Sequence, residues 1–243
     1  MVLQPIIFVH IPKTGGSTIH KNLAGQLCLR TFHDREPNPL SSRLSKKNLR
    51  ALLRPTHPPA DAEYIYGHFP ANKHRRRYPN ARYATWFRHP VERLVSHYYF
   101  WLRKPDYNNT TCMTLIKKRL GLVQFAALAK MRNVHRRFLD GRLPDDFDFV
   151  GIVEHYAPSL ALFKTLFFAE APLEFPADNV NPLKKLGAYY PLDPSDRAAI
   201  ESYNRADLAL YERARACFHR LCSHHLGVRV TRMAREDLGG DVA

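Results

Sequence analysis

Short apolar runs alternate with polar turns and with helical patterns along most of this chain. Runs rich in β-branched and aromatic residues predict four buried strands, at residues 5–11, 64–68, 82–87 and 147–153. Beyond the first run, Ile19, Leu23 and Leu27 recur at helical spacing. Strands that alternate with helices predict an α/β fold, with a central and mostly parallel sheet flanked by helices.

Helix signals are strongest after residue 88. Pro90 suits the first turn of a helix, and the apolar residues behind it share one face: Val91, Leu94, Val95, Tyr98 and Leu102. Shorter helices are predicted at residues 46–53, 113–118, 121–129 and 159–168. Asp193 is a helix N-cap with proline behind it, and it opens a helical stretch to about residue 226 with a break near residues 203–204.

Nothing in the sequence divides the chain into two domains. It shows no internal repeat, no low-complexity tract and no linker rich in glycine, proline or serine. A chain of 243 residues lies at the upper edge of what one compact domain usually reaches. We therefore predict one domain over residues 1–243, with a loop at 179–190 and a polar, frayed tail from about residue 233.

The balance of charge narrows the partners. Lysine and arginine number 37 against 22 aspartate and glutamate, so the formal net charge is +15. A field of this sign attracts nucleic acids, acidic glycans, anionic membrane surfaces and polyphosphate-like cofactors, and it does not choose among them. Hydrophobic residues make up 45% of the chain, which argues against a wholly disordered protein.

Neither a membrane-spanning segment nor a secretory signal is evident in the pattern. No apolar stretch approaches the roughly 20 residues that a membrane-spanning helix needs. The N-terminus has no basic segment before its short apolar run. We therefore expect a soluble protein, cytoplasmic if the sequence is complete and in the Golgi lumen if an N-terminal anchor has been removed. The four scattered cysteines predict reduced thiols rather than a disulfide framework.

The turn after the first predicted strand combines several groups that bind anions. Residues 12–18 read P-K-T-G-G-S-T and lead directly into a helical pattern. Gly15 and Gly16 let main-chain amides approach an anion without interference from a Cβ, and a helix start adds unpaired N–H groups. Lys13 adds a mobile charge, and hydroxyl side chains follow the glycines. A tight turn without a ligand would explain the glycines alone, but the whole set favours a phosphate or sulfonate site.

The order of residues in this turn differs from that in nucleoside triphosphatases. Their loop reads G-x-x-x-x-G-K-[ST], with the lysine after the last glycine and a hydroxyl that binds magnesium. Here Lys13 precedes the glycines, and Glu154 is the only acidic candidate near the end of a predicted strand. A sulfuryl group carries less negative charge than a phosphoryl group, so cationic side chains and main-chain dipoles can suffice. We therefore expect sulfuryl transfer without a metal.

The turn resembles the 5′-phosphosulfate loop of sulfotransferases that use 3′-phosphoadenosine 5′-phosphosulfate. The likeness is closest to the heparan sulfate and uronyl 2-O-sulfotransferase branch, whose members carry a similar H-I-P-K-T-G-S/G-T block. Residues 10–18 of this chain read H-I-P-K-T-G-G-S-T. The resemblance extends from residue 6 to residue 218 and is poor between residues 29 and 62. It implies a P-loop-like fold of three layers.

A second segment resembles the family's 3′-phosphate element, R-D/N-P-x-x-R-x-x-S-x-Y-Y. Residues 88–99 read R-H-P-V-E-R-L-V-S-H-Y-Y, with His89 where the family has aspartate or asparagine. The resemblance implies that Arg88 and Ser96 bind the 3′-phosphate. A basic helix cap with a buried aromatic face would explain the aromatic residues but not Arg88 together with Ser96. For Arg93, the alternative to a contact with the ligand is an ion pair, either with the glutamate beside it or with an acidic group elsewhere.

Residues 64–69, Y-I-Y-G-H-F, resemble the strand-end segment whose histidine is the family's proposed catalytic base. The resemblance implies that His68 removes the proton of the acceptor hydroxyl and that Lys13 stabilises the oxygen between phosphate and sulfate. The products would be an O-sulfated saccharide or glycolipid and adenosine 3′,5′-bisphosphate. The glycan enzymes carry another histidine two positions earlier, where this chain has Tyr66. Without the resemblance, a lone histidine is more often a hydrogen-bonded structural residue.

Two later segments resemble structural parts of the family. Residues 149–154 are similar to a strand, and residues 204–211 are similar to a terminal helix in which Asp207 and Tyr211 fix the packing. The charge run at residues 73–77 has two readings, as the lining of a groove for an acidic acceptor or as a solvated face.

A further stretch resembles, more weakly, the loop that closes over the cofactor. It comprises Asn181 and the K-K-L-G sequence at residues 184–187. With this stretch included, the resemblance implies the following cofactor-binding residues: Lys13, Thr14, Gly15, Gly16, Ser17, Thr18, Arg88, Ser96, Lys184 and Lys185.

Two other classes of function stay open at this point. A metal-dependent nucleotide kinase or hydrolase with a degenerate phosphate loop predicts dependence on magnesium and an acidic strand end near Lys13. A non-enzymatic basic module that binds nucleic acid predicts aromatic residues interleaved with the basic patch. The aromatic residues at 98–101 crowd a predicted helix instead, where core packing explains them. We therefore expect a hydroxyl-bearing acceptor, with an acidic saccharide as one candidate, and no nucleic acid.

Overall fold

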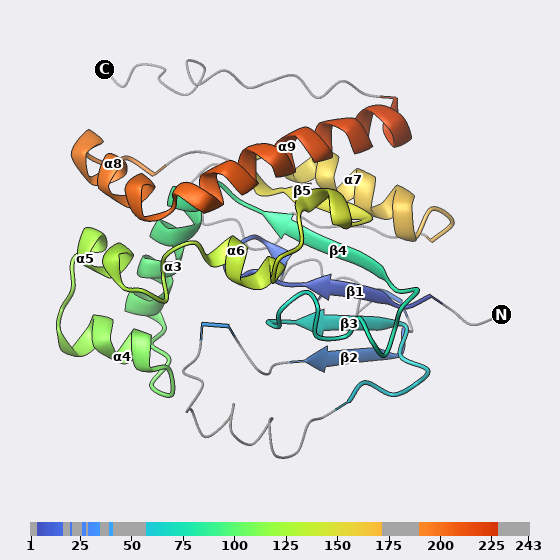
Figure 1. Cartoon of the computed structure of the whole chain (residues 1–243), viewed down its shortest axis with the longest axis horizontal. Helices are drawn as coiled ribbons and strands as arrows, with labels where there is room; N and C mark the ends of the chain where they lie inside the picture. The colour runs from blue at the N-terminus through green and yellow to red at the C-terminus, as the bar shows by residue number, and fades with distance from the viewer. Residues whose placement is uncertain are drawn as a thin grey trace.

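A parallel sheet forms the centre of the protein (Figure 1). The computed structural model describes residues 4–16, 20, 26–27, 29–34, 39–40, 57–171 and 190–227. In that part of the chain the sheet has five strands in the order β2-β3-β1-β4-β5, and every neighbouring pair is parallel. The strands are β1 (Ile6–Val9), β2 (Thr31–Asp34), β3 (Tyr64–Gly67), β4 (Arg82–Phe87) and β5 (Phe149–Ile152).

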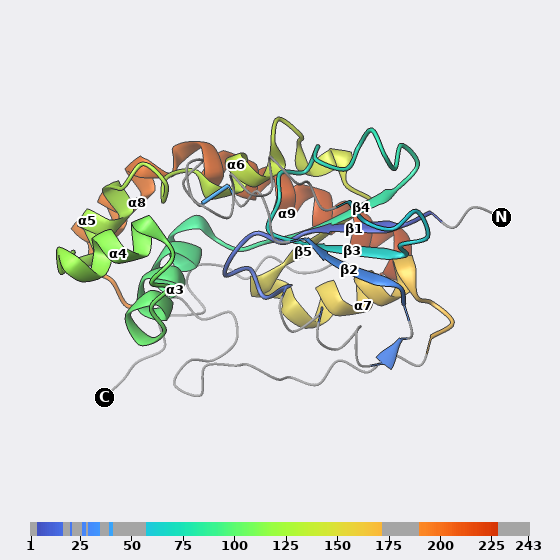
Figure 2. The same ribbon diagram turned by 90° about the horizontal axis from the view of Figure 1, so that it is seen from below.

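Helices cover both faces of this sheet, which confirms the expected α/β fold. They are α3 (Pro90–Arg103), α4 (Thr110–Lys117), α5 (Leu122–Ala127), α6 (Val134–Leu139), α7 (Tyr156–Phe167), α8 (Pro194–Tyr203) and α9 (Arg205–Leu226). Short 3-10 turns lie at Pro144–Asp146 and Val153–His155. Figure 2 shows α7 on one face of the sheet and α6 on the other. Helix α9 packs against both β5 and α7.

The topology fixes where a site can form. Strand β1 is the middle of the sheet, between β3 and β4, and all three strands are almost entirely buried. This double burial explains their continuous apolar sequences. The carboxyl ends of all strands point to one side, where α3, α4, α5 and α8 lie (Figure 1). The segments that follow β3, β1 and β4 therefore meet at that edge, which is where open parallel sheets bind ligands.

Two elements were absent from the sequence-based prediction. Strand β2 is an edge strand that pairs only with β3 in the described part of the sheet. Two of its four residues are exposed and one is half-buried, so it lacks a continuous apolar run. Helix α6 has only six residues, and its sequence V-H-R-R-F-L has apolar residues only at its two ends, so it shows no clear helical period. The predicted apolar face of α3 was wrong at one position: Leu102 is 44% exposed, whereas Trp101 is buried against Phe125.

The predicted boundary between the last two helices is confirmed. The Asp193 carboxylate accepts from the main-chain N–H of Ser195, 2.8 Å away, at the start of α8. Asn204 separates α8 from α9, and its buried side-chain amide donates to the Ile200 carbonyl over 2.9 Å. The helix predicted at 46–53, most of the loop at 179–190 and the tail from residue 233 lie outside the described residues.

The described residues include several long helices and three of the four cysteines. No helix there has both the length and the apolar character that crossing a membrane demands. Cys112, Cys217 and Cys222 are buried free thiols, and Cys28 lies outside the described residues. The assignment of one domain to residues 1–243 stays a prediction, because it extends beyond those residues.

Candidate active site

The loop after β1 is bent by residues in the left-handed conformation. Lys13 and Gly15 have φ angles of 71° and 80°, a region that suits glycine and strains lysine. Between them, Thr14 is fully buried and its hydroxyl donates to the Ile11 carbonyl over 2.8 Å. The side chain of Thr14 therefore shapes the loop instead of facing a ligand. A turn of this kind, with left-handed residues at alternate positions, can make a concave anion-binding nest of main-chain N–H groups.

Gly16 packs directly on the side chain that precedes the loop. A Cβ at this position would lie 2.7 Å from Cδ2 of His10 and 3.2 Å from Cε1 of Phe8. Both of those rings are buried in the core, so they have little room to move. The φ of Gly16 lies outside the left-handed region, so its backbone conformation does not require glycine. The close contact with the two rings does.

We expect Gly16→Ala to lower the free energy of unfolding by about 1–3 kcal/mol, because the added methyl group overpacks a filled site. Urea and thermal unfolding would measure the loss. Gly121→Ala is the matched control, since its Cβ would meet no atom closer than 3.8 Å. Gly121 is the N-cap of α5, so its replacement should cost under about 1 kcal/mol. Equal losses in the two variants would contradict the packing argument.

Lys13 lies over an aromatic ring of α3 and close to other cations. Its Nζ atom is 4.0 Å from the centroid of the Phe100 ring. Burial, followed by the positive fields of three neighbours, lowers the pKa of Lys13 to about 8. Those neighbours are Arg88, Arg103 and Lys104. A lysine that other cations repel regains stability when an anion binds beside it, so the site favours an anionic ligand.

Arg88 follows β4 and reaches the loop after β1. Its Nη1 atom donates to the main-chain oxygen of Lys13 in a long hydrogen bond of 3.4 Å. Arg88 is partly exposed, and it forms no ion pair with an acidic side chain of the described residues. Ser96, also partly exposed, lies two turns into α3. The two predicted anion-binding segments therefore meet at Lys13 and Arg88.

His68 follows β3 and lies beside the residue that precedes the loop. In the parallel register Val9 is opposite Gly67, so His10 and His68 emerge next to each other. The Nδ1 atom of His68 is 2.7 Å from the main-chain oxygen of His10. A carbonyl can only accept, so Nδ1 carries the proton and Nε2 is left as the basic nitrogen. Burial lowers the pKa of His68, and the bond to His10 opposes that shift only in part.

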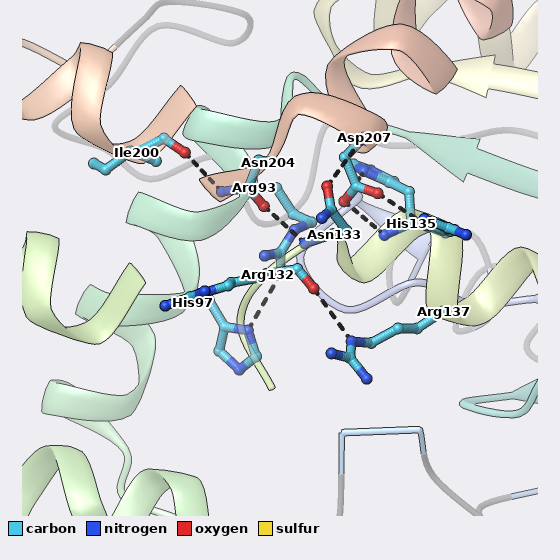
Figure 3. Close-up of polar contacts among 10 residues, drawn as sticks. Arg93, His97, Arg132, Asn133, His135, Arg137, Ile200, Asn204 and Asp207 are labelled. Atoms are coloured by element: carbon cyan, nitrogen blue, oxygen red, sulfur yellow. Dashed lines mark hydrogen bonds and ion pairs between the residues drawn. The ribbon is translucent and has the colours of Figure 1, made fainter. Parts of the chain in front are cut away.

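His97 and Arg93 form a buried pair on the same helix (Figure 3). The Nη1 atom of Arg93 lies 3.5 Å from Nδ1 of His97, at the outer limit of a hydrogen bond. Burial lowers the pKa of His97, and the charges of Arg93, Lys13 and His68 add to the effect. The His97 ring therefore lies within the electrostatic influence of both Lys13 and His68. Its neutral ring accepts at Nδ1 and carries its proton on Nε2.

Among the described residues, Arg93 forms no ion pair with Glu92 or with another acidic side chain. Its Nε and Nη2 atoms have no hydrogen-bond partner in the described part of the chain. Burial lowers the pKa of Arg93 to about 10, although the negative field of Asp207 acts in the opposite direction. Glu92 is engaged elsewhere, with the main-chain N–H of Tyr190 at 2.8 Å and Nη2 of Arg197 at 3.3 Å.

Reciprocal caps join α6 to α9 close to Arg93 (Figure 3). The fully buried Asp207 carboxylate accepts from the main-chain N–H groups of His135 and Arg136, at 2.8 and 2.9 Å, and from the His135 ring at 3.0 Å. In return, Asn133 Oδ1 accepts from the main-chain N–H of Asp207 at 3.2 Å. These bonds are in keeping with the structural role inferred for Asp207.

Glu154 ties the start of α3 to α9. One carboxylate oxygen accepts from the main-chain N–H of His89 and the other from the Tyr211 hydroxyl, both at 2.9 Å. Burial raises the pKa of Glu154, while these bonds and the field of Arg88 act against that shift. Both oxygens of this strand-end acid are therefore engaged within the protein. Tyr211 acts in the packing, in keeping with the inference from the sequence.

The charge run after β3 divides into two parts. Lys73 and His74 contact the buried Asp34 carboxylate at the end of β2, at 2.5 and 2.7 Å. These contacts tie the turn to the sheet. The remaining three residues of the run, at 75–77, are exposed. Lys73 and His74 therefore act in the structure, and only residues 75–77 fit a solvated or acceptor-facing surface.

Some predicted site residues cannot be placed. Ser17, Thr18, Asn181, Lys184 and Lys185 lie outside the described residues. Their assignment to the cofactor stays a prediction from the resemblance. In the part of the chain that the structure describes, no three His, Cys, Asp or Glu side chains form a group suited to a metal ion.

Several residues at this edge of the sheet were not singled out as site residues from the sequence. They are His10 and Tyr66 beside His68, His97 and Phe100 on α3, and Tyr190 near Arg88. Only their neighbours in the motifs offered a signal, because these contacts join residues that are far apart along the chain. Phe100 directly follows the second motif, and His10 opens the first.

Comparisons with known proteins address the family to which the chain belongs. A solved sulfotransferase from Alicyclobacillus acidocaldarius is similar, with 14% sequence identity, 90% of this chain and 97% of that chain covered, and a TM-score of 0.46. No curated protein matches the chain. A model of the sulfotransferase family matches residues 4–140, which is more than half of the chain and includes the segments after β1, β3 and β4. The chain therefore belongs to the sulfotransferase family.

Proposed function

We propose that this sulfotransferase moves the sulfuryl group of 3′-phosphoadenosine 5′-phosphosulfate to a hydroxyl group of its acceptor. The observation that carries the proposal is the meeting of three segments at one edge of the sheet. Lys13 after β1 and Arg88 after β4 are joined by a hydrogen bond, and His68 after β3 is bonded to the residue that opens the loop. One anionic donor can therefore reach both cations and a neutral base.

The residues present suit a donor with phosphate groups at both ends of a nucleoside. The bent loop with Gly15 and Gly16 would hold the 5′-phosphosulfate, with Lys13 at its bridging oxygen. Arg88 would bind the 3′-phosphate together with Ser96. Support comes from the cations themselves, because Arg88 has no ion-pair partner among the described residues and the neighbours of Lys13 oppose its charge.

Transfer would proceed by in-line displacement. Nε2 of His68 takes the proton of the acceptor hydroxyl while the oxygen forms a bond to sulfur. The bond between sulfur and the bridging phosphate oxygen breaks, and adenosine 3′,5′-bisphosphate leaves with the electron pair. Lys13 stabilises the negative charge that grows on that oxygen. Positioning and charge stabilisation would supply most of the rate.

The acceptor is proposed at a coarser level. The resemblance to the heparan sulfate and uronyl 2-O-sulfotransferase branch supports a hydroxyl on a saccharide or glycolipid. The exposed arginines at 75–77 follow His68 closely in the chain, which supports an acidic saccharide. A screen for sulfate transfer to neutral and acidic saccharides, with Arg76→Ala compared with the parent, would test this assignment. We expect Arg76→Ala to lose activity relative to the parent on acidic saccharides and to keep it on neutral ones. Activity on acidic saccharides that equals the parent's would count against the assignment.

Calorimetry with adenosine 3′,5′-bisphosphate and with ATP tests the donor. We expect micromolar binding of the bisphosphate without magnesium and a large loss in Lys13→Ala and Arg88→Ala, because each variant removes a charged contact to phosphate. Lys117→Ala and Arg76→Ala are controls, since both side chains are exposed and lie outside these segments. Tighter binding of ATP that depends on magnesium would instead favour a kinase or hydrolase.

Binding of the bisphosphate should take up protons near pH 8. The pKa of Lys13 is lowered to about 8, chiefly by burial and then by neighbouring cations, so part of the population is neutral there. A bound anion favours the charged form and raises this pKa, so binding draws in up to about half a proton at pH 8. Calorimetry in buffers of different ionisation enthalpy measures this uptake. Lys13→Arg should abolish it, and uptake that persists in that variant would assign it to another group.

A further inference from the structure

The imidazole of His10 is fixed from several sides at the centre of the proposed site. Its Nδ1 atom forms a short hydrogen bond with the hydroxyl of Tyr66. One face stacks on the His68 ring, with centroids 4.4 Å apart and planes 24° from parallel. The Cδ2 edge lies against Gly16, where a Cβ would approach to 2.7 Å. His10 is also buried, so its ring has one orientation and one set of partners.

Tyr66 is held as firmly as His10. Its ring stacks on His20 with centroids 4.0 Å apart and planes 2° from parallel. The centroid of the Phe8 ring lies 5.6 Å from that of Tyr66. Its hydroxyl is therefore directed at His10 by the packing of its ring. A hydroxyl that donates to Nδ1 requires that His10 carry its own proton on Nε2, which is the neutral form of the ring.

The ring of His10 lies under the group that is proposed to become charged. When His68 accepts the acceptor proton, it becomes a cation 4.4 Å above the His10 ring. A neutral His10 ring carries no net charge that would repel this cation. A protonated His10 at the same distance would repel that cation and oppose the proton transfer. The charge state of His10 therefore controls how readily His68 acts as a base.

We propose that Tyr66 and His10 are positioning residues for the base: Tyr66 donates to Nδ1 of His10 and keeps that ring neutral, and the neutral ring supports His68 when it takes the proton. This inference rests on the proposed role of His68. It gives Tyr66 a role at the position where the glycan enzymes carry a second histidine. The main-chain oxygen of His10 fixes the tautomer of His68, and the side chain of His10 fixes its electrostatic surroundings.

Other titratable groups also face His10, and they act in the same sense. They are Tyr66 in β3, His68 just after β3, His33 in β2, His20 in the segment after the loop, and Lys13 in the loop itself. Burial lowers the pKa of His10 far below its ordinary value, and His68, His20, His33 and Lys13 lower it further. Loss of the Tyr66 hydroxyl removes a bond to the neutral form and therefore raises this pKa.

Tyr66→Phe tests the proposal, because it keeps the stacked ring and removes only the hydroxyl. We expect kcat at pH 8 to stay within about twofold of the parent, and the acid limb of the kcat profile to move to higher pH, because His10 gains its charge at a higher pH without the Tyr66 hydroxyl. The KM for the donor should not change. Tyr64→Phe is the matched control: Tyr64 is buried on the same strand, and its hydroxyl has no hydrogen-bond partner among the described residues. The control should keep the parent's pH profile.

An acid limb that stays at the parent's pH, or a loss of kcat that is equal across the whole profile, would overturn the proposal, since a purely structural role does not depend on pH. A second measurement uses the unmodified protein with ¹⁵N- and ¹³C-labelled histidine. We expect its NMR spectra to show His10 neutral, with the proton on Nε2, from pH 6 to pH 8. A proton on Nδ1 would overturn the proposal. These spectra need no turnover, so a protein that transfers no sulfate would refute the proposed function and leave the His10–Tyr66 pair to be decided separately.

Discussion

Alanine in place of His68 is expected to lower kcat for sulfate transfer by about 10²- to 10⁴-fold, the range that a general base contributes. The Nδ1 proton of His68 is committed to the His10 carbonyl, so Nε2 is the nitrogen left to act as the proposed base. Because burial lowers the pKa of His68, the ring is neutral and basic at neutral pH. Transfer of labelled sulfate at pH 7.5 measures the loss, and the acid limb of the pH profile should disappear with it.

The same variant must still bind the donor product for this interpretation to hold. His68 does not touch Lys13 or Arg88 in any described contact, so the affinity for adenosine 3′,5′-bisphosphate should stay within about threefold of the parent. His225→Ala, at an exposed position of α9, should change neither quantity. Retention of full kcat by His68→Ala would assign the base elsewhere, and loss of bisphosphate binding would indicate a disturbed fold.

Removal of the Asp207 carboxylate is expected to lower the free energy of unfolding by about 3–5 kcal/mol. This fully buried group accepts two main-chain N–H bonds at the start of α6 and one bond from the His135 ring. Asp207→Ala leaves all three donors without a partner and removes the negative field that offsets the buried charge of Arg93. Urea unfolding at pH 7 measures the change.

Asp145→Ala provides the contrast, because this acid bridges Arg213 and Arg220 at the surface and should contribute under about 1 kcal/mol. The effect of Asp207 also has a predictable pH dependence. Burial would raise its pKa, but the field of His135 and the hydrogen bonds lower it overall. A lowered folded pKa stabilises above the ordinary pKa of aspartate, so the difference between Asp207→Ala and the parent should shrink as the pH falls below about 4.

The sequence was informative about the fold wherever burial was complete. Strands β1, β3, β4 and β5 have continuous apolar sequences because both of their faces are covered, and each was predicted. The edge strand β2 was not predicted. It pairs with β3 and is only partly buried, so its sequence has no continuous apolar run. The order of the strands is a long-range property, which no local pattern encodes.

For the site, the sequence indicated which segments matter but not how their side chains are used. The motifs identified Lys13, Arg88 and His68, which the sheet brings to one edge. They also suggested Thr14 as a ligand contact, whereas its hydroxyl closes the loop internally. The pair of His10 and Tyr66 could not be inferred, because it depends on the register between β1 and β3.

The central position of β1 has a consequence for synthesis of the chain on the ribosome. Strand β1 is made before both of its partners, β3 and β4, and among the described strands β5 joins the sheet only after residue 152 has been made. Helix α9 follows all five of these strands and buries Tyr211, Ala214 and Phe218. The nascent chain therefore carries exposed apolar strands until residues 205–226 have followed, so aggregation during this interval should lower its yield when it is overproduced.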